Sequence, residues 1–155
     1  MVVYDIEMFP NCFLLCVGNP ETRKSLTFEI SDKRDDRESM FEYLRKLYRE
    51  KTWMVGFNNL SFDWPLLSYI LNNKKATTED IYKRGSKLIK SENEPFIKHT
   101  IPQIDLYKIH HFDNKAKMTS LKVLEFNMRM DNIEELPFEP GSILEPENID
   151  VAQDY

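Results

Sequence analysis

The first thirty residues consist of short apolar runs separated by turn-forming residues. Apolar runs of this length, bounded by proline, asparagine and glycine, are typical of strands joined by tight turns. The runs are Val2–Ile6, Phe13–Val17 and Leu26–Ile30, and the turns are Pro10-Asn11 and Gly18-Asn19-Pro20. We therefore expect an antiparallel meander of three strands.

The period of the apolar positions changes after residue 31. Between residues 31 and 51 the apolar side chains recur every three or four positions, and charged residues lie between them. This spacing places the apolar side chains on one face of an amphipathic helix. They are Met40, Phe41, Leu44, Leu47 and Tyr48. We expect Asp35 or Asp36 to cap the start of this helix.

A fourth strand and a second helix are expected next. The short uninterrupted apolar run Trp53–Phe57 predicts a strand that is buried on both faces. A loop over Asn58–Ser61 follows, and Asp63–Leu71 then has the pattern of a helix. Ser61 is a possible N-cap of this helix, and Pro65 suits its first turn.

The following stretch is polar. Residues 72–98 are rich in lysine and predict an irregular insertion. A further apolar strand is expected over Ile104–Tyr107. Thr119 or Ser120 is expected to cap a helix that continues through Phe126.

The C-terminal part combines a connection with a last helix. Residues 129–146 contain three prolines and predict a long connection. Pro146 then opens a helical segment that reaches Tyr155. Strands that first follow one another and then alternate with helices predict an α/β fold whose sheet has mixed strand directions.

The composition is that of a globular chain. Of 155 residues, 41% are hydrophobic, and a chain of this length buries roughly 68–70% of its unfolded surface. We therefore expect one domain over residues 1–155. No apolar run approaches the roughly 18 residues of a membrane span, and the N-terminus has no signal-peptide pattern. Cys12 and Cys16 lie too far apart on one strand for a disulfide and are expected to be buried thiols of an intracellular protein.

Charge is unevenly distributed along the chain. The net charge of −5 argues against a protein that coats DNA non-specifically. Residues 74–122 nevertheless carry 11 basic and 6 acidic side chains, whereas residues 123–155 carry 1 and 9. The basic middle segment could meet a phosphate backbone, or it could be a solvated lysine-rich surface.

Two acidic residues lie close together on the first expected strand. Asp5 and Glu7 are two positions apart, so their side chains point to the same face. Neighbouring carboxylates repel each other, and Mg²⁺ or Mn²⁺, which prefer oxygen ligands, would relieve that repulsion. Two solvated acids at the edge of a strand are the alternative interpretation.

Asp63 is a candidate third carboxylate. It lies where the loop after the fourth expected strand enters the second helix. Such a junction suits a ligand that must approach the first strand. The alternative is that Asp63 only caps its helix.

Three motifs in these segments resemble one known family. Tyr4-Asp5-Ile6-Glu7 resembles the first motif of DEDD-type 3′–5′ exonucleases. Asn59-Leu60-Ser61-Phe62-Asp63 resembles the second, in the Asn-x-x-Phe-Asp form of the proofreading domains of phage family B DNA polymerases. Ser120-Leu121-Lys122-Val123-Leu124 is similar to the Ser/Thr-Leu-x-x-hydrophobic motif that contacts single-stranded DNA in protein-primed members. The order also agrees, and the resemblance implies a ribonuclease H-like α/β fold over essentially the whole chain.

The third exonuclease motif of that family, Tyr-x-x-x-Asp on the last helix, is incomplete. Tyr155 resembles its tyrosine, and the aspartate would follow about one helical turn later. The sequence is expected to be either a fragment of a longer enzyme or a natural truncation that lacks one metal ligand. Asp154 is a poor substitute, because it lies about 100° around the helix from Tyr155.

The resemblance implies a two-metal mechanism at the acidic residues. Two Mg²⁺ or Mn²⁺ ions about 3.5–4 Å apart would straddle the terminal phosphodiester, with Asp5 bridging them. Glu7 would hold the ion that activates the attacking water, and Asp63 would hold the ion near the leaving 3′ oxygen. Tyr155 would orient the water.

The resemblance also implies contacts with a frayed single strand. Asn59 and Phe62 would contact the 3′ end, with Phe62 against a base or sugar. Ser120 and Leu121 would contact it from the neighbouring helix. The implied partners are the 3′ end of single-stranded DNA and the polymerase part of a longer parent chain, and no membrane is involved.

Other acidic and imidazole residues fit the site less well. Asp105 resembles a residue of a strand that flanks the site, which implies a structural role. His110 and His111 would point to opposite faces if they lay on a strand, so one ion could not easily bind both. Two further functions stay open: a non-catalytic nucleic-acid-binding module and a stand-alone exoribonuclease of the same fold.

Overall fold

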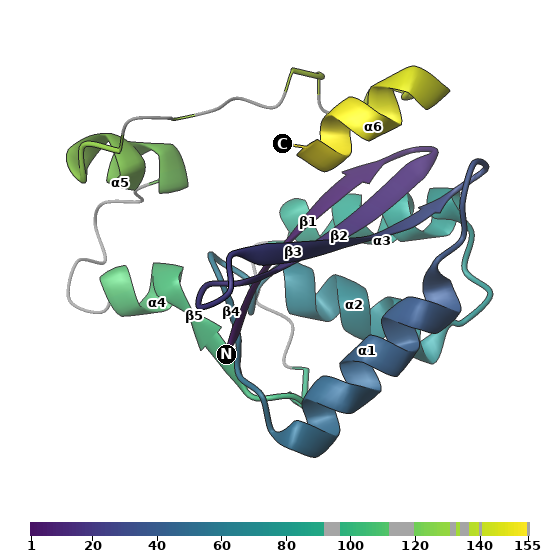
Figure 1. The fold of residues 1–155 in the computed structure, drawn as a ribbon. Helices are drawn as coiled ribbons and strands as arrows, with labels where there is room; N and C mark the ends of the chain where they lie inside the picture. The colour runs from purple at the N-terminus through teal and green to yellow at the C-terminus, as the bar shows by residue number, and fades with distance from the viewer. Residues whose placement is uncertain (92–96, 112–119, 131–132, 134–136, 140, 155) are drawn as a thin grey trace.

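A five-stranded sheet forms the centre of the protein (Figure 1). The computed structural model describes residues 1–91, 97–111, 120–130, 133, 137–139 and 141–154. The strands are β1 (Val2–Phe9), β2 (Cys12–Asn19), β3 (Lys24–Ser31), β4 (Met54–Gly56) and β5 (Gln103–Asp105). The helices are α1 (Arg37–Glu50), α2 (Asp63–Asn72), α3 (Thr78–Ile89), α4 (Leu106–His110), α5 (Leu121–Asn127) and α6 (Pro146–Asp154). No helix within these residues is long and apolar enough to cross a membrane.

The strand order is β3-β2-β1-β4-β5, and β1 to β3 form the expected antiparallel meander. Strand β4 pairs with β1 in parallel, through Val2 opposite Met54 and Val3 opposite Val55. Strand β5 pairs with β4 in parallel as well. The predicted α/β fold with a sheet of mixed direction is therefore confirmed.

One face of the sheet carries the main hydrophobic core. Tyr4 and Ile6 of β1 point into it, and α1 and α2 cover it. Buried partners from the other strands and the helices include Phe13, Leu15, Phe28, Ile30, Met40, Leu44, Trp64, Leu66, Leu67 and Ile70. The apolar period of α1 agrees with this packing, because Met40, Phe41, Leu44 and Leu47 are all buried.

The opposite face of the sheet carries the acidic residues. Successive side chains of a strand alternate between faces, so Asp5, Glu7 and Phe9 point away from the main core; we call this side the acid face. Helix α6 covers one end of the acid face, where Phe9, Cys12 and Leu14 pack against Leu144, Ile149 and Ala152. Figure 1 shows α6 on the opposite side of the sheet from α1 and α2.

The expectation of an irregular insertion over residues 72–98 is wrong, because α3 occupies Thr78–Ile89. Thr77 and Asp80 form a capping box at its start, in which each side chain bonds the backbone N–H of the other residue. Ile81, Gly85 and Leu88 are buried. Lys83 and Lys87 are exposed on the other side of this amphipathic helix, and the many charged and polar residues of the segment concealed its apolar stripe.

Other boundaries also differ from expectation. The strand expected over Ile104–Tyr107 ends at Asp105, whose carboxylate accepts the N–H groups of Tyr107 and Lys108 and so starts α4. His110 is therefore the last residue of a helix rather than part of a strand. Phe62, not Ser61, occupies the N-cap position of α2.

Several expected elements agree with the structure. Helix α2 covers the predicted Asp63–Leu71, and α6 starts at Pro146. Ser120 caps α5 by accepting the N–H of Val123. Of the two cysteines, Cys12 is buried as expected, whereas Cys16 is partly exposed on the acid face, opposite Asp5.

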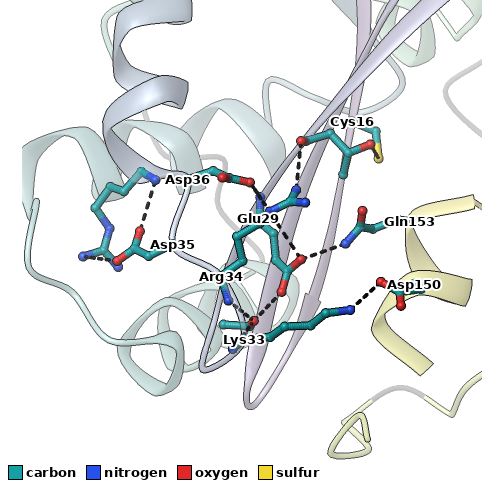
Figure 2. A network of polar contacts seen from close by, with 11 residues as sticks. Cys16, Glu29, Lys33, Arg34, Asp35, Asp36, Asp150 and Gln153 are labelled. Carbon is teal, nitrogen blue, oxygen red and sulfur yellow. Dashed lines mark hydrogen bonds and ion pairs between the residues drawn. The ribbon is translucent and has the colours of Figure 1, made fainter. Parts of the chain in front are cut away.

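Polar contacts hold α6 against the meander (Figure 2). Glu29 of β3 is fully buried, and its carboxylate accepts hydrogen bonds from Ser31 Oγ and from Gln153 Nε2, the latter at 2.8 Å. Lys33 forms an ion pair with Asp150 at 2.6 Å, and both of these side chains are exposed. The buried bond through Gln153 therefore has more effect on stability than the surface ion pair.

We expect Gln153→Ala to lower the free energy of unfolding by about 1–3 kcal/mol, because it removes a donor from a buried carboxylate oxygen. Lys33→Ala is the matched control and should cost about 0–1 kcal/mol, as exposed ion pairs do. Urea denaturation of the two variants measures both values. Equal losses would contradict this account of how α6 is anchored.

Candidate active site

The acidic residues meet where β1 extends past the end of β4. The pairing of β1 with β4 stops at Val3, so Asp5 and Glu7 lie beyond the last paired residues. Asp63 is the first residue of α2 and is only 4% exposed. The chain between β4 and α2 is short, and it brings Asp63 to the free edge of β1 next to Asp5.

The pKa values of all three carboxyl groups are raised. Burial raises the pKa of Asp63 well above its usual range, and the charge of Asp5 raises it further. The pKa of Glu7 rises to about 7, first through desolvation and then through the charge of Asp5. Asp5 keeps exposed atoms, yet desolvation raises its own pKa. Asp5 thus interacts with both other acids.

The donor atoms of the site suit a divalent cation. Asp63 Oδ1 is buried and has no hydrogen-bond partner among the described residues. Carboxylate oxygens, one of them buried and without a donor, match the ligand preference of Mg²⁺ and Mn²⁺. Within the described part of the chain, no three Asp, Glu, His or Cys side chains are grouped closely enough to hold a metal ion. The carboxylates are therefore chemically suited to a metal, and they do not form a closed set of three ligands.

Buried hydrogen bonds hold the loop before α2 in place. The Asn59 amide donates to Tyr4 Oη at 3.1 Å and to Gln103 Oε1 at 3.0 Å, and Tyr4 Oη donates to the same Gln103 oxygen at 2.9 Å. Burial is the main cause that raises the pKa of Tyr4, so its hydroxyl remains a donor. Asp105 accepts the backbone N–H groups of Asn58 and Leu60.

The predicted strand-contacting residues occupy different environments. Asn59 is fully buried, so its side chain does not lie on a surface that a DNA strand could reach. Phe62, at the end of the loop before α2, is partly exposed and packs against the main core. Phe62 thus remains available for contact, whereas Asn59 supports the loop.

The structure does not bring Ser120 or Leu121 to the acids. Ser120 and Leu121 are exposed at the start of α5, which lies apart from the sheet in Figure 1. Tyr155 lies outside the described residues. Asp150 is exposed on α6 and pairs with Lys33, away from Asp5.

Tyr4, Gln103 and Asp105 support the site, and of these three the family resemblance implies a structural role for Asp105 alone. Tyr4 is part of the first motif, but nothing in the sequence indicates that its hydroxyl bonds a side chain 99 positions away. The Asp105 carboxylate joins the loop after β4 to the start of α4, as a buried acid with several N–H donors can do. Its position at the end of an apolar strand is the signal that could have indicated this role.

Gly56 allows Asn59 to lie against β4. A Cβ atom at Gly56 would be 2.8 Å from Asn59 Cβ and 3.3 Å from the Tyr4 carbonyl oxygen. The bonds of Asn59 to Tyr4 and Gln103 prevent its side chain from moving away without loss. The close approach therefore requires a glycine.

We expect Gly56→Ala to reduce stability by about 1–3 kcal/mol, as overpacking of a rigid interior does. Gly18→Ala is the control, because a Cβ there meets no atom within 4 Å. This substitution should leave stability unchanged or raise it by up to about 1 kcal/mol. Thermal or urea unfolding measures the difference. A neutral Gly56→Ala variant would show that the loop tolerates a shift of Asn59.

The raised pKa values predict a pH dependence of stability. The pKa of Glu7 is about 7 in the folded protein and 4.5 in the unfolded chain, so the folded protein binds more protons between these values. Raising the pH through this window therefore favours unfolding, and the raised pKa values of Asp5 and Asp63 act in the same direction. In EDTA, the Tm should fall between about pH 5 and pH 7, and Glu7→Gln should flatten part of the fall. A Tm that rises over this range would refute the assignment.

A family model of the RNase H superfamily matches residues 2–137 of the chain. Comparisons with curated proteins and with solved structures gave no match. The matched range contains all five strands and the three acids Asp5, Glu7 and Asp63. Nucleases of this superfamily hydrolyse phosphodiester bonds and typically use divalent metals. A mixed sheet with acids on its first strand agrees with that match, and the chain belongs to the RNase H superfamily.

Proposed function

We propose that the protein is a metal-dependent 3′–5′ exonuclease that acts on single-stranded DNA. The observation that carries the proposal is the group of acids at the free edge of β1. Burial and, after it, the charge of Asp5 raise the pKa values of both Glu7 and Asp63, and a buried oxygen of Asp63 has no partner among the described residues. Groups with strongly perturbed pKa values cluster at functional sites.

Asp5, Glu7 and Asp63 are the residues that would hold two divalent cations, Mg²⁺ or Mn²⁺. Bound there, the cations would polarise the scissile phosphodiester and lower the pKa of an attacking water. Glu7, whose pKa of about 7 lies near neutral pH, can hold or release a proton beside that water. We further propose that Tyr155 orients the water.

The substrate strand would reach the acids past the loop before α2. Phe62 would pack against a base or sugar near the 3′ end, and Asn59 would act indirectly by fixing the loop that presents Phe62. Ser120 and Leu121 would contact the strand if α5 approaches the acid face. We further propose that this domain acts inside a cell, beside the polymerase part of a longer viral-type chain, where it would remove mispaired 3′ ends.

The proposal is tested with a 5′-labelled single-stranded oligonucleotide and Mn²⁺, using residues 1–155 and the product of the full reading frame. An active protein should give a ladder of products shortened from the 3′ end. Asp5→Asn should lower the rate at least about 10²-fold, because it removes a charge that the transition state needs. Asp32→Asn, which changes an exposed acid at a distance from the site, is the matched control.

The product pattern separates the alternatives. Faster cleavage of the matching RNA oligonucleotide would favour an exoribonuclease. Binding of the oligonucleotide by both proteins without any shortened product would refute the exonuclease and support a non-catalytic binding module.

A further inference from the structure

Aromatic side chains lie at the edge of the sheet where Asp5 also lies. Strands β1, β4 and β5 run parallel, so their carboxyl ends meet at one edge. The last residues paired between β1 and β4 are Val3 and Val55, and Asp5 and Phe57 each lie two positions beyond them. Tyr107 lies in the first turn of α4, which follows β5 directly (Figure 1). Both aromatic residues therefore belong to segments that leave the sheet beside the acids.

The carboxylate of Asp105 fixes these two segments relative to each other. Its Oδ1 atom accepts the backbone N–H of Asn58 at 2.9 Å and that of Tyr107 at 2.9 Å. Asp105 is buried, so water competes little for these hydrogen bonds. Burial is the main cause that raises the pKa of Asp63, and the charge of Asp105 adds to it, which indicates that the two carboxylates are close. The segments that carry Phe57 and Tyr107 are thus fixed near the acids.

The rings in these segments contact one another in order. The Phe57 and Tyr107 rings meet edge to face, with centroids 5.5 Å apart. The Tyr107 and His111 rings are stacked at 4.1 Å, and His111 Nδ1 lies 2.8 Å from the Tyr107 carbonyl oxygen. The edge of the His110 ring contacts His111 at 5.1 Å. We call Phe57, Tyr107, His110 and His111 the aromatic row.

Core packing does not explain the aromatic row. Phe57, Tyr107 and His111 are partly exposed, and His110 is exposed. Within the part of the chain that the structure describes, Phe57 and Tyr107 belong to neither of the two buried hydrophobic clusters. The acids beside the row repel the phosphates of a DNA strand, whereas the bases are neutral and have π faces that stack on aromatic side chains. The row therefore offers the strand a contact that the acids do not oppose.

We propose that the aromatic row is a stacking platform for a nucleobase of the single-stranded DNA whose 3′ end lies at Asp5. This inference rests on the proposed function and names a further binding site for the same substrate. The loop before α2 begins at Phe57 and ends at Phe62, so aromatic contacts lie at both ends of the loop that the strand passes. Stacking accepts every base, which suits an enzyme that must act on any 3′ end.

Binding is measured by the fluorescence anisotropy of a 5′-fluorescein oligothymidylate of about ten nucleotides. Ca²⁺ is present as a hard cation with the same oxygen preference, and a gel confirms that the probe stays intact. Tyr107→Leu keeps an apolar side chain but removes the ring, so it should weaken binding on the order of tenfold. The slope of log K against log salt should not change, because no phosphate contact is lost.

Two variants serve as controls for the loss of the ring. Tyr107→Phe keeps the ring and should bind nearly as tightly as the unaltered protein. Tyr48→Leu makes the same substitution at an exposed tyrosine of α1, which covers the opposite face of the sheet from the acids, and should have little effect. Thermal unfolding confirms that each variant folds.

Changes in the oligonucleotide test whether the row contacts a base. A probe in which one thymidine is replaced by an abasic residue keeps every phosphate. At the position that stacks on the row, this change should weaken binding of the unaltered protein on the order of tenfold, and should cost Tyr107→Leu little, because the same contact is already lost. Photocrosslinking of 5-iodouracil at that position, followed by mass spectrometry, needs no variant and should label Phe57 or the segment from Tyr107 to His111.

The outcomes distinguish the two proposals. If the unaltered protein neither binds nor shortens the oligonucleotide, the proposed function fails. If it binds and cleaves, but Tyr107→Leu binds as Tyr48→Leu does, the stacking platform is refuted. Abasic positions that cost the unaltered protein and Tyr107→Leu the same, or crosslinks confined to other segments, would likewise refute it.

Discussion

The alternation of side chains along β1 determines which face of the sheet packs against the main core and which face carries the acids. Tyr4 and Ile6 point into the main core, and Asp5 and Glu7 point to the opposite face. A shift of one residue in the pairing of β1 with β2 would turn both carboxylates into the apolar core, at a high desolvation cost. Burial on one face and charge on the other therefore favour the same register. This register therefore determines that Asp5 and Glu7 lie on the acid face.

Beneath the site, polar groups are buried and bonded to one another. Tyr4, Asn59 and Gln103 belong to three segments that are distant in sequence, and their hydrogen bonds join β1, the loop before α2, and β5. Asp105 adds bonds to the backbone of the same loop. Buried networks of this kind specify one arrangement, because a shifted arrangement would leave polar groups without partners. The position of Asp63 beside Asp5 depends on this network.

The sequence predicted the elements whose signals are local. The meander, α1, α2 and α6 follow from the spacing of apolar positions and from proline, and the shared face of Asp5 and Glu7 follows from strand geometry. Helix α3 was missed because charged and polar residues outnumber its apolar residues, although Thr77 and Asp80 form a recognisable cap. The burial of Asn59 could not be predicted, because its partner Gln103 is 44 residues away. The metal ions and the role of Tyr155 remain predictions.

The contacts of α6 have a consequence for how the protein folds. Its bonds join residues 117 and 124 positions apart in the sequence, whereas the meander pairs strands that are neighbours. Contacts between distant residues form late, because the long intervening loop must close first. The meander can therefore assemble early, and α6 docks on the acid face afterwards. For the same reason α6 is a natural unit of local opening, and its release would uncover Phe9 and Leu14 while the main core stays folded.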